Sequence, residues 1–254
     1  MSKRYFAEIA YLGTAYHGFQ KQLNAKSIQQ TVDEALQIVL KHKIESTTSS
    51  RTDAGVHAKQ NYLQFDFEGQ ITDSFLYNVN AILPDDIVLK QLYEVPLHIH
   101  ARFDAIGRKY LYQINTKKNP FLQDRAWYYP YPISVNKLQE FANCLIQKTD
   151  FSTFAKKHAN NKTSICSIHV AKWWKKEQTI LFEVEGNRFL RGMVRGLVAT
   201  QLMAMRKNWS VDRFQQIIHE KNNAHAFFNA PAKALFLQEV KFETALLKPI
   251  FEVV

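Results

Sequence analysis

The sequence has 254 residues, of which 46% are hydrophobic and 13% aromatic, and its 33 Lys and Arg against 23 Asp and Glu give a net charge of +10. This composition is typical of a globular protein, and the 8 Gly and 7 Pro exclude a collagen-like or linker chain. No stretch reaches the roughly 18 consecutive apolar residues of a membrane helix, and Glu8 interrupts the first apolar run, so neither a membrane span nor a secretory signal is expected.

Charge is distributed unevenly along the chain. Residues 1–103 contain 10 Lys and Arg against 11 Asp and Glu, whereas residues 104–254 contain 23 against 12. We therefore predict two domains with these boundaries, an N-terminal α/β half and a basic C-terminal α/β half. The basic half favours a polyanionic partner such as nucleic acid, because cations displace condensed counterions from phosphates. The two cysteines are too few for a disulfide framework, which predicts free thiols in a reducing cytoplasm.

The predicted elements of the first half alternate between strands and helices. Residues 5–11 and 62–67 show the period of two that is typical of strands, and Ser27 with Gln30 has the form of a capping box before an apolar stripe at helical spacing. The predicted order is strand, helix, strand, helix, strand, over residues 5–11, from Ser27, 62–67, 72–80 and 87–92.

The second half is predicted to contain strands at 108–114, 168–174, 179–185 and 235–242, with helices from Ser134, from Arg188 to Lys207 and from Ser210. Strands and helices that mix without a regular βαβ rhythm favour an α+β fold. We predict a largely antiparallel mixed sheet built from two similar halves and flanked by helices.

One polar loop, residues 49–58, contains the highest concentration of residues that could take part in chemistry. Asp53 lies two residues after Arg51 and two before Gly55, so a cation and a tight turn could hold the carboxylate ionised as a nucleophile or base. The alternative is an ordinary turn closed by a surface ion pair.

Other chemistries have weaker signals. An aspartic protease needs two such loops, and only one Asp-Ala-Gly occurs. His98 and His100 would share one side of a strand, and Cys166 and His169 are three residues apart, but neither pair has a third ligand at a familiar zinc spacing. Glycine-rich nucleotide-binding loops are absent.

Three arginines stand out in the second half. Arg188, Arg191 and Arg195 are expected on one helix, where Arg191 and Arg195 would face the same way. Because like charges on one face repel each other, this grouping suggests a polyanion or a buried carboxylate, and a solvated surface is the alternative.

From end to end, the sequence resembles the A family of tRNA pseudouridine synthases, which isomerise uridines in the anticodon stem-loop. Arg51-Thr52-Asp53-Ala54-Gly55-Val56-His57-Ala58 is the most specific segment. The other matching segments are 13–20, 27–29, 80–87, 100–103, 108–112, 150–154, 189 with 193–195, and 230–235.

The resemblance implies a pseudouridine synthase fold and a set of site residues. Asp53 matches the catalytic aspartate, Tyr110 the tyrosine that stacks on the flipped base, and Arg195 the arginine that pairs with the carboxylate. The residues expected to contact the substrate are Arg51, Leu235, His57, Arg102 and Arg191.

The resemblance also implies tRNA as the substrate, a cytoplasmic homodimer, and no metal or organic cofactor. Against the family pattern, Ser50, Ala199 and Ala234 replace glycines, Leu12 replaces an aspartate and Cys166 an arginine. These changes put loop geometry in question rather than the reaction class. Two other functions stay open: a non-catalytic RNA-binding protein, and a metal-dependent hydrolase that would use His98, His100 and Asp85 or Asp86.

Overall fold

The computed structural model describes residues 2–146, 148–156 and 163–251, and the chain divides into two compact units. The first unit runs to Ile106 and takes in the chain again from Leu237; the second is Gly107–Phe236. The return of the C-terminal segment to the first unit has no counterpart in the composition of the sequence.

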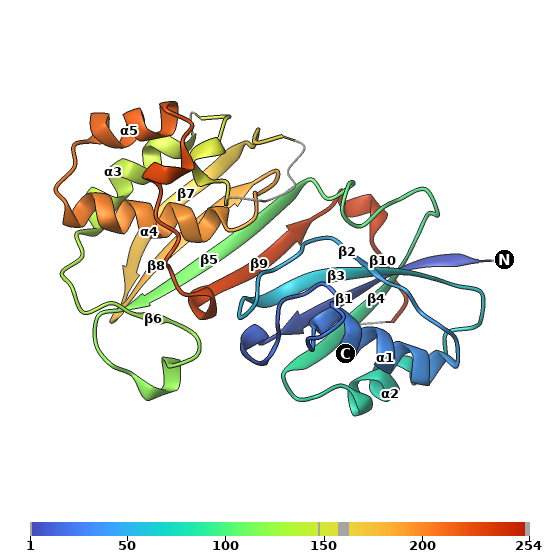
Figure 1. Cartoon of the computed structure of the whole chain (residues 1–254). Helices are drawn as coiled ribbons and strands as arrows, with labels where there is room; N and C mark the ends of the chain where they lie inside the picture. The colour runs from blue at the N-terminus through green and yellow to red at the C-terminus, as the bar shows by residue number, and fades with distance from the viewer. Residues whose placement is uncertain (1, 147, 157–162, 252–254) are drawn as a thin grey trace. The chain divides into compact units, whose positions relative to one another are not determined.

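The first unit is built on an antiparallel sheet (Figure 1). In it β1 pairs with β3 on one side and with β4 on the other, and Tyr5 lies opposite Phe65 with their rings 5.5 Å apart. Its strands are β1 (Lys3–Tyr11), β2 (Thr47–Thr48), β3 (His57–Phe67), β4 (Ile87–Val95) and β10 (Lys248–Pro249), and β9 (Leu235–Lys241) begins in the second unit and ends in the first.

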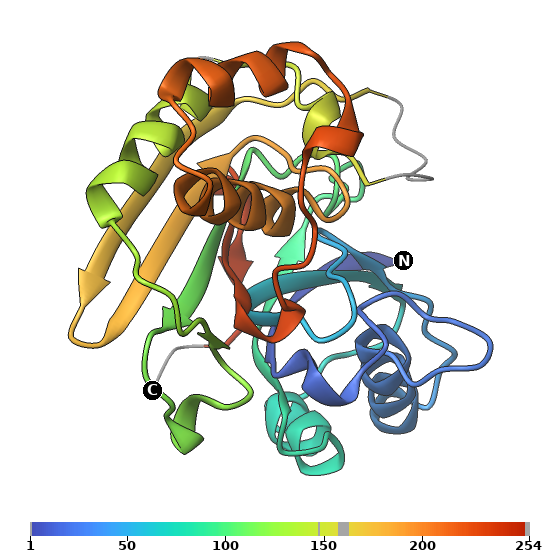
Figure 2. The same ribbon diagram turned by 60° about the vertical axis from the view of Figure 1, so that its left-hand side comes forward.

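Two helices pack side by side in this unit, α1 (Ile28–Leu40) and α2 (Phe75–Ile82), drawn in blue and blue-green in Figure 2. Ser27 caps α1 as predicted, with its hydroxyl accepting from the Gln30 amide at 3.2 Å. The reciprocal bond of a capping box is absent, because the Gln30 side chain donates to Glu34 instead.

The second unit repeats the combination of antiparallel strands and helices. β8 (Thr179–Gly186) pairs antiparallel with β5 (Gly107–Asn115) and β7 (Ile168–Lys176), and the short β6 (Trp127–Tyr128) runs parallel to β5. Helix α3 packs on β7 and contacts the other two helices. The helices are α3 (Val135–Ile146), α4 (Met193–Arg206) and α5 (Val211–His219). The α+β, largely antiparallel fold predicted from the sequence is therefore confirmed.

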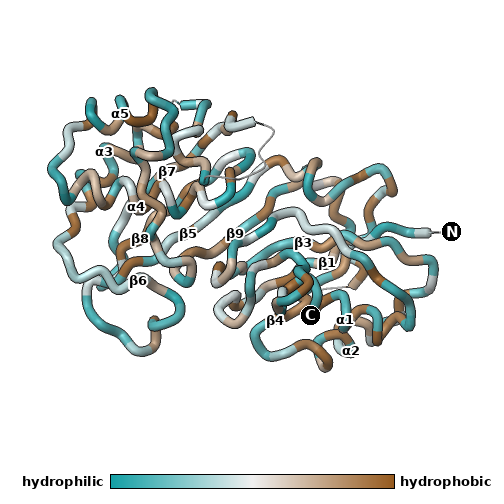
Figure 3. The backbone as a smooth tube through the Cα atoms, in the orientation of Figure 1, coloured by the Kyte–Doolittle hydropathy of each residue, from teal (hydrophilic) through white to brown (hydrophobic). Residues whose placement is uncertain are grey.

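Short 3-10 helices cover Gly13–Ala15, Pro120–Leu122, Ser152–Phe154, Asn223–His225, Ala232–Ala234 and Thr244–Leu246. Hydrophobic residues concentrate on the strands and helices, whereas the loop between β5 and β6 is mostly hydrophilic (Figure 3). In α5 the buried residues are Phe214, Ile217 and Ile218, one face of an amphipathic helix. None of the helices in the described ranges combines the length and the apolar character needed to cross a bilayer.

The predicted helix from Arg188 to Lys207 is wrong at its start. Helix α4 begins only at Met193, because Gly192 has a φ of +71° and lies outside the helix as its N-cap. Arg188 and Arg191 therefore precede the helix, and only Arg195 lies on it.

One buried carboxyl group in the first unit forms no ion pair among the described residues. Asp33 of α1 is 8% exposed, and its Oδ1 has no hydrogen-bond partner within the described structure. Burial raises the pKa of Asp33 from 3.8 to about 6, and contact with Ser46 offsets only part of this rise. The folded protein therefore binds a proton at Asp33 more tightly than the unfolded chain does, and ionising this carboxyl costs stability.

We predict that Asp33→Asn stabilises the protein at neutral pH. Because the folded pKa is raised, the wild type loses stability as pH rises from about 4 to about 6. The variant lacks this loss and should gain about 3 kcal/mol over the wild type at pH 7, and much less at pH 4. Urea unfolding at both pH values measures the difference. Asp73→Asn, at an exposed position, is the control. It should change the free energy of unfolding by the same small amount at pH 4 and at pH 7.

Candidate active site

Asp53 lies in a tight turn of the first unit. The Val56 amide donates to the Asp53 carbonyl at 3.1 Å, and Gly55 has a φ of +80°, a conformation that favours glycine. The Asp53 side chain is partly exposed. The turn therefore presents a carboxylate with a fixed backbone to solvent.

The segment that follows β1 packs its backbone directly on this turn. The Phe19 amide donates to the Thr52 carbonyl at 3.1 Å. A Cβ added at Gly18 would lie 3.0 Å from the Thr52 carbonyl oxygen and 3.4 Å from the Asp53 carbonyl carbon, and Gly18 has a φ of +99°. A Cβ at Gly13 would overlap the Val56 carbonyl oxygen. Both glycines are thus required for the close approach.

A buried amide holds the start of the loop. Asn61 of β3 is 0% exposed, and its Nδ2 donates to the Ser50 carbonyl at 2.8 Å while its Oδ1 accepts from the Ser49 hydroxyl at 2.8 Å. Ser50 itself does not have a positive φ. The Ser at this position therefore does not strain the loop, and the same holds for Ala199 and Ala234.

His57 belongs to the interior of the loop. Its ring is 1% exposed, and Nδ1 accepts from the Gly13 amide at 3.0 Å. A neutral ring with its proton on Nε2 satisfies this bond. The contact joins the Gly13 segment to the residue that follows the Asp53 turn.

Arg51 does not form the ion pair with Asp53 that the sequence suggested. Its side chain is exposed, and within the described ranges it pairs with no carboxylate. A guanidinium left in solvent beside the loop is available to a phosphate oxygen.

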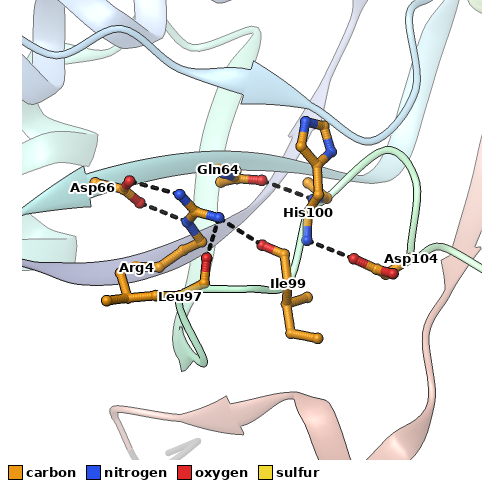
Figure 4. A network of polar contacts seen from close by, with 8 residues as sticks. Arg4, Gln64, Asp66, Leu97, Ile99, His100 and Asp104 are labelled. Atoms are coloured by element: carbon orange, nitrogen blue, oxygen red, sulfur yellow. Dashed lines mark hydrogen bonds and ion pairs between the residues drawn. The ribbon is translucent and has the colours of Figure 1, made fainter.

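A second polar network in the first unit shapes the turn that carries Arg102 (Figure 4). The His100 amide donates to Asp104 at 2.7 Å, and the Ala101 amide donates to the Gln64 side chain at 2.8 Å. Arg4, which also forms a bidentate pair with Asp66 at 2.7 Å, donates to the carbonyls of Leu97 and Ile99. The exposed Arg102 guanidinium lies 5.7 Å from the centre of the Phe103 ring.

The remaining predicted residues belong to the second unit. Tyr110 of β5 is 8% exposed and meets the Phe189 ring edge-to-face at 5.1 Å. Arg195 lies in the first turn of α4, and its Nε donates to the Ala230 carbonyl at 2.7 Å. Leu235 is buried at the start of β9, and Arg191 is exposed.

Arg195 is an unusual residue for its position. The N-terminus of a helix carries a partial positive charge, so a cation there is unfavourable without an anionic or carbonyl partner. A Cβ at the neighbouring Gly196 would lie 2.8 Å from the Phe228 ring, so this glycine lets the 228–230 segment approach the helix. The Ala230 carbonyl thereby reaches Arg195.

The residues considered for metal binding are not grouped. Across the part of the chain that is described, no cluster of three or more His, Cys, Asp or Glu could hold an ion. His98 and His100 lie in the turn beyond β4 rather than on a strand. His100 Nδ1 accepts from the Arg102 amide, and Asp86 accepts from the Tyr16 hydroxyl at 2.6 Å.

Comparison with known proteins places this loop in a family. Residues 7–104 and 142–243 match the family model described as tRNA pseudouridine synthase. The chain is 40% identical over 243 residues to the tRNA pseudouridine synthase A of Bacteroides fragilis, which covers 94% of this chain and 96% of that protein. It is 37% identical over 246 residues to that of Azobacteroides pseudotrichonymphae, with 96% and 99% covered. The chain belongs to the tRNA pseudouridine synthase family. Pseudouridine synthases are isomerases, so the protein is an enzyme of that class.

A solved structure, that of a Cbf5–Nop10–Gar1 complex, aligns with a TM-score of 0.34 and 9% identity over 78% of this chain and 53% of that chain. This similarity is too low to add to the assignment. Two residues of β3 have structural roles that the sequence did not indicate. The Asn61 side chain bonds the backbone of the loop at Ser50, and the Gln64 side chain bonds the backbone of the Arg102 turn. A lone Asn or Gln on a predicted strand gives no signal of this.

We predict that Gly18→Ala slows pseudouridine formation at least tenfold. The added Cβ meets the Thr52 carbonyl oxygen at a left-handed φ, so the Asp53 turn must shift, and small misplacements of a reacting group are costly. Single-turnover rates with tRNA measure this. In the control Gly69→Ala the three atoms nearest to the added Cβ belong to the Phe67 ring, a side chain that can move, and not to the backbone of the Asp53 turn. A Gly18→Ala enzyme with the wild-type rate would contradict the assigned role of the backbone contact.

Proposed function

We propose that the protein converts uridine to pseudouridine in the anticodon stem-loop of tRNA, at nucleotides 38 to 40, with Asp53 as the nucleophile. The observation that carries the proposal is the Asp53 turn, a partly exposed carboxylate on a backbone fixed by Gly18, Gly13 and Asn61, within the segment that matches the family. The same turn would serve an RNA-binding protein poorly, because an anionic side chain repels phosphate.

The reaction needs no electron or energy carrier. Asp53 attacks C1′ of the ribose or C6 of the uracil, the N1–C1′ bond breaks, the base turns, C5 bonds to C1′, and the bond between Asp53 and the substrate breaks, which regenerates the carboxylate. The proton lost from C5 is balanced by the one gained at N1. Covalent catalysis and positioning suffice for such an isomerisation, so we propose that no metal or organic cofactor takes part.

The other site residues have proposed roles that follow the resemblance. Tyr110 stacks on the extruded base and accepts or relays the C5 proton, Arg195 keeps the catalytic carboxylate ionised, and Leu235 forms an apolar wall. Arg51, Arg102 and Arg191 are exposed and bind RNA phosphates. His57 is proposed to position the loop, because its ring is buried.

We further propose a homodimer that works in the cytoplasm. Both cysteines, Cys144 and Cys166, are free and buried, which suits a reducing compartment.

Extruding the target uridine costs a few kcal/mol and costs least in a loosely stacked loop, which supports the anticodon arm as the site of modification.

We predict that Asp53→Asn abolishes catalysis. The amide has nearly the same shape but is not a nucleophile, so tritium release from tRNA labelled at uridine C5 should fall below about one thousandth of the wild-type rate. Asp85→Asn, an exposed carboxylate of the same unit, is the matched control and should keep full activity. Tritium release by the Asp53→Asn enzyme at the wild-type rate would refute the role of Asp53. An inactive wild type on every tRNA would refute the function.

We predict that Tyr110→Phe lowers the single-turnover rate about 10² to 10³-fold, the usual loss for a general acid or base, and leaves tRNA affinity unchanged. Phe keeps the ring that stacks and packs on Phe189. Tyr110→Ala should also lose affinity, because the stacking surface is gone. Comparing filter-binding affinities with single-turnover rates separates the two functions, and equal rates for wild type and Tyr110→Phe would exclude a proton-transfer role.

A further inference from the structure

A pocket of about 160 Å³ lies in the second unit, at the C-terminal end of α4, and none of the proposed catalytic residues lines it. Its walls include the rings of Trp127, Tyr129 and Tyr131, and its polar groups include those of Arg206 and Asn229. We call it the Tyr131 pocket.

The aromatic wall is held in place by backbone pairing and by ring contacts. Trp127 pairs with Ile114 of β5, and the Tyr129 amide donates to the Asn115 carbonyl at 2.8 Å. The rings meet edge-to-face, with centroids 5.0 Å apart from Trp127 to Tyr129 and 5.2 Å apart from Tyr129 to Tyr131. Tyr131 is 44% exposed, so this rigid surface reaches solvent.

Arg206 stands over the outer ring of this wall. Its guanidinium carbon lies 4.0 Å from the centre of the Tyr131 ring. No carboxylate of the described chain forms an ion pair with it. Arg206 lies in the last turn of α4, where a cation suits the helix dipole, and no carbonyl or carboxylate among the described residues accepts from its planar N–H groups. The residue therefore offers charge, a flat face and directed donors to a ligand.

The charge around the pocket indicates an anionic ligand. The second unit holds 21 Lys and Arg against 8 Asp and Glu, and the next residue after Arg206 is Lys207, which lies 5.5 Å from the centre of the Phe227 ring. Exposed aromatic rings interleaved with cations are the surface on which unpaired nucleotides bind, with bases on the rings and phosphates on the cations.

We propose that the Tyr131 pocket binds one unpaired nucleotide of the tRNA, other than the uridine that is isomerised. The proposal rests on tRNA being the substrate, as proposed above. The base stacks on the aromatic wall, Arg206 donates to a phosphate or a base oxygen, and the Asn229 amide reads a base edge. Arg206 lies eleven positions after Arg195 on α4, a rise of about 16 Å, and neither Arg195 nor Tyr110 lines the pocket, so the nucleotide bound there is not the one that is isomerised.

An unpaired nucleotide fits the pocket better than a paired one. Both faces of a base inside an RNA helix are covered by its neighbours in the stack, and only its edges are accessible. An unstacked base can place a face against the aromatic rings and an edge against the polar groups of the pocket. The volume of about 160 Å³ equals roughly five water molecules, which is room for a single ring system.

The test compares the affinity of four variants for an unmodified tRNA transcript, measured by filter binding. Tyr131→Leu and Arg206→Met should each raise Kd about tenfold, the loss expected for one stacked base. Arg206→Lys keeps the charge but not the planar face, so it should recover less than half of this loss on a logarithmic scale. The matched control is Arg213→Met, which removes an exposed arginine beside Trp209 in the same unit and should change Kd less than twofold.

Three further readouts make the result decisive. Single-turnover rates at saturating tRNA should stay within twofold of the wild type for all four variants, since the pocket acts in binding. Ultraviolet cross-linking of wild-type protein to the transcript should link a nucleotide to a peptide that contains Trp127 to Tyr131 or Arg206. Melting temperatures report on folding.

The proposal is overturned if the pocket variants bind tRNA as the Arg213→Met protein does, or if Arg206→Lys binds like the wild type, which would reduce Arg206 to a charge. It is also overturned if Tyr131→Leu shifts the sedimentation of the RNA-free protein to smaller species, because the pocket would then hold a second copy of the chain. An inactive wild type that shows the expected pattern of affinities would refute the proposed function and leave the pocket assignment standing.

Discussion

The first unit depends on one steric constraint, the contact between two stretches of backbone around Asp53. Gly18 and Gly13 leave no space for a side chain against residues 52–56, and the amides that lie there bond directly to the turn. Backbone contacts of this kind cannot relax by a change of rotamer. If Asp53 is the nucleophile, as proposed, this backbone contact holds the turn that carries it in one position before the covalent step.

The second unit uses the same device at Arg195. Gly196 admits the Phe228 ring, the chain beyond it brings the Ala230 carbonyl to Arg195, and the Tyr112 hydroxyl donates to the next carbonyl, that of Pro231, at 2.9 Å. Burial raises the pKa of Tyr112 well above its usual value, so the hydroxyl stays a donor. In both units a glycine allows a close approach near a charged residue: in the first it fixes the backbone of the Asp53 turn, and in the second it brings a carbonyl to the Arg195 side chain.

Most of the fold could be predicted because its signals are local and periodic. The Ser27 cap and the stripe on α5 each concern neighbouring residues. The start of α4 could not be predicted. The apolar pattern begins before Gly192, and only the positive φ of Gly192 prevents the helix from starting earlier than Met193. The Asn61 and Gln64 bonds join residues distant in sequence, and a single polar residue on a strand gives no indication of its partner. For Asp53 the sequence motif was the stronger signal. The motif predicted the residue, and the structure then gave the physical reason why Gly13 and Gly18 pack against its turn.

Charge explains why chemistry and affinity depend on different residues. The first unit as a whole holds 12 Lys and Arg against 15 Asp and Glu, and a carboxylate repels phosphate. Under the proposed function, the free energy of RNA binding therefore comes from exposed cations such as Arg51 and from the second unit, with its excess of 13 positive charges. Counterion release does not depend on the RNA sequence, so it favours the binding of any RNA with little discrimination. Selecting one stem-loop then requires contacts that only unpaired bases make, and a rigid aromatic pocket beside an arginine without a carboxylate partner is a surface of that kind.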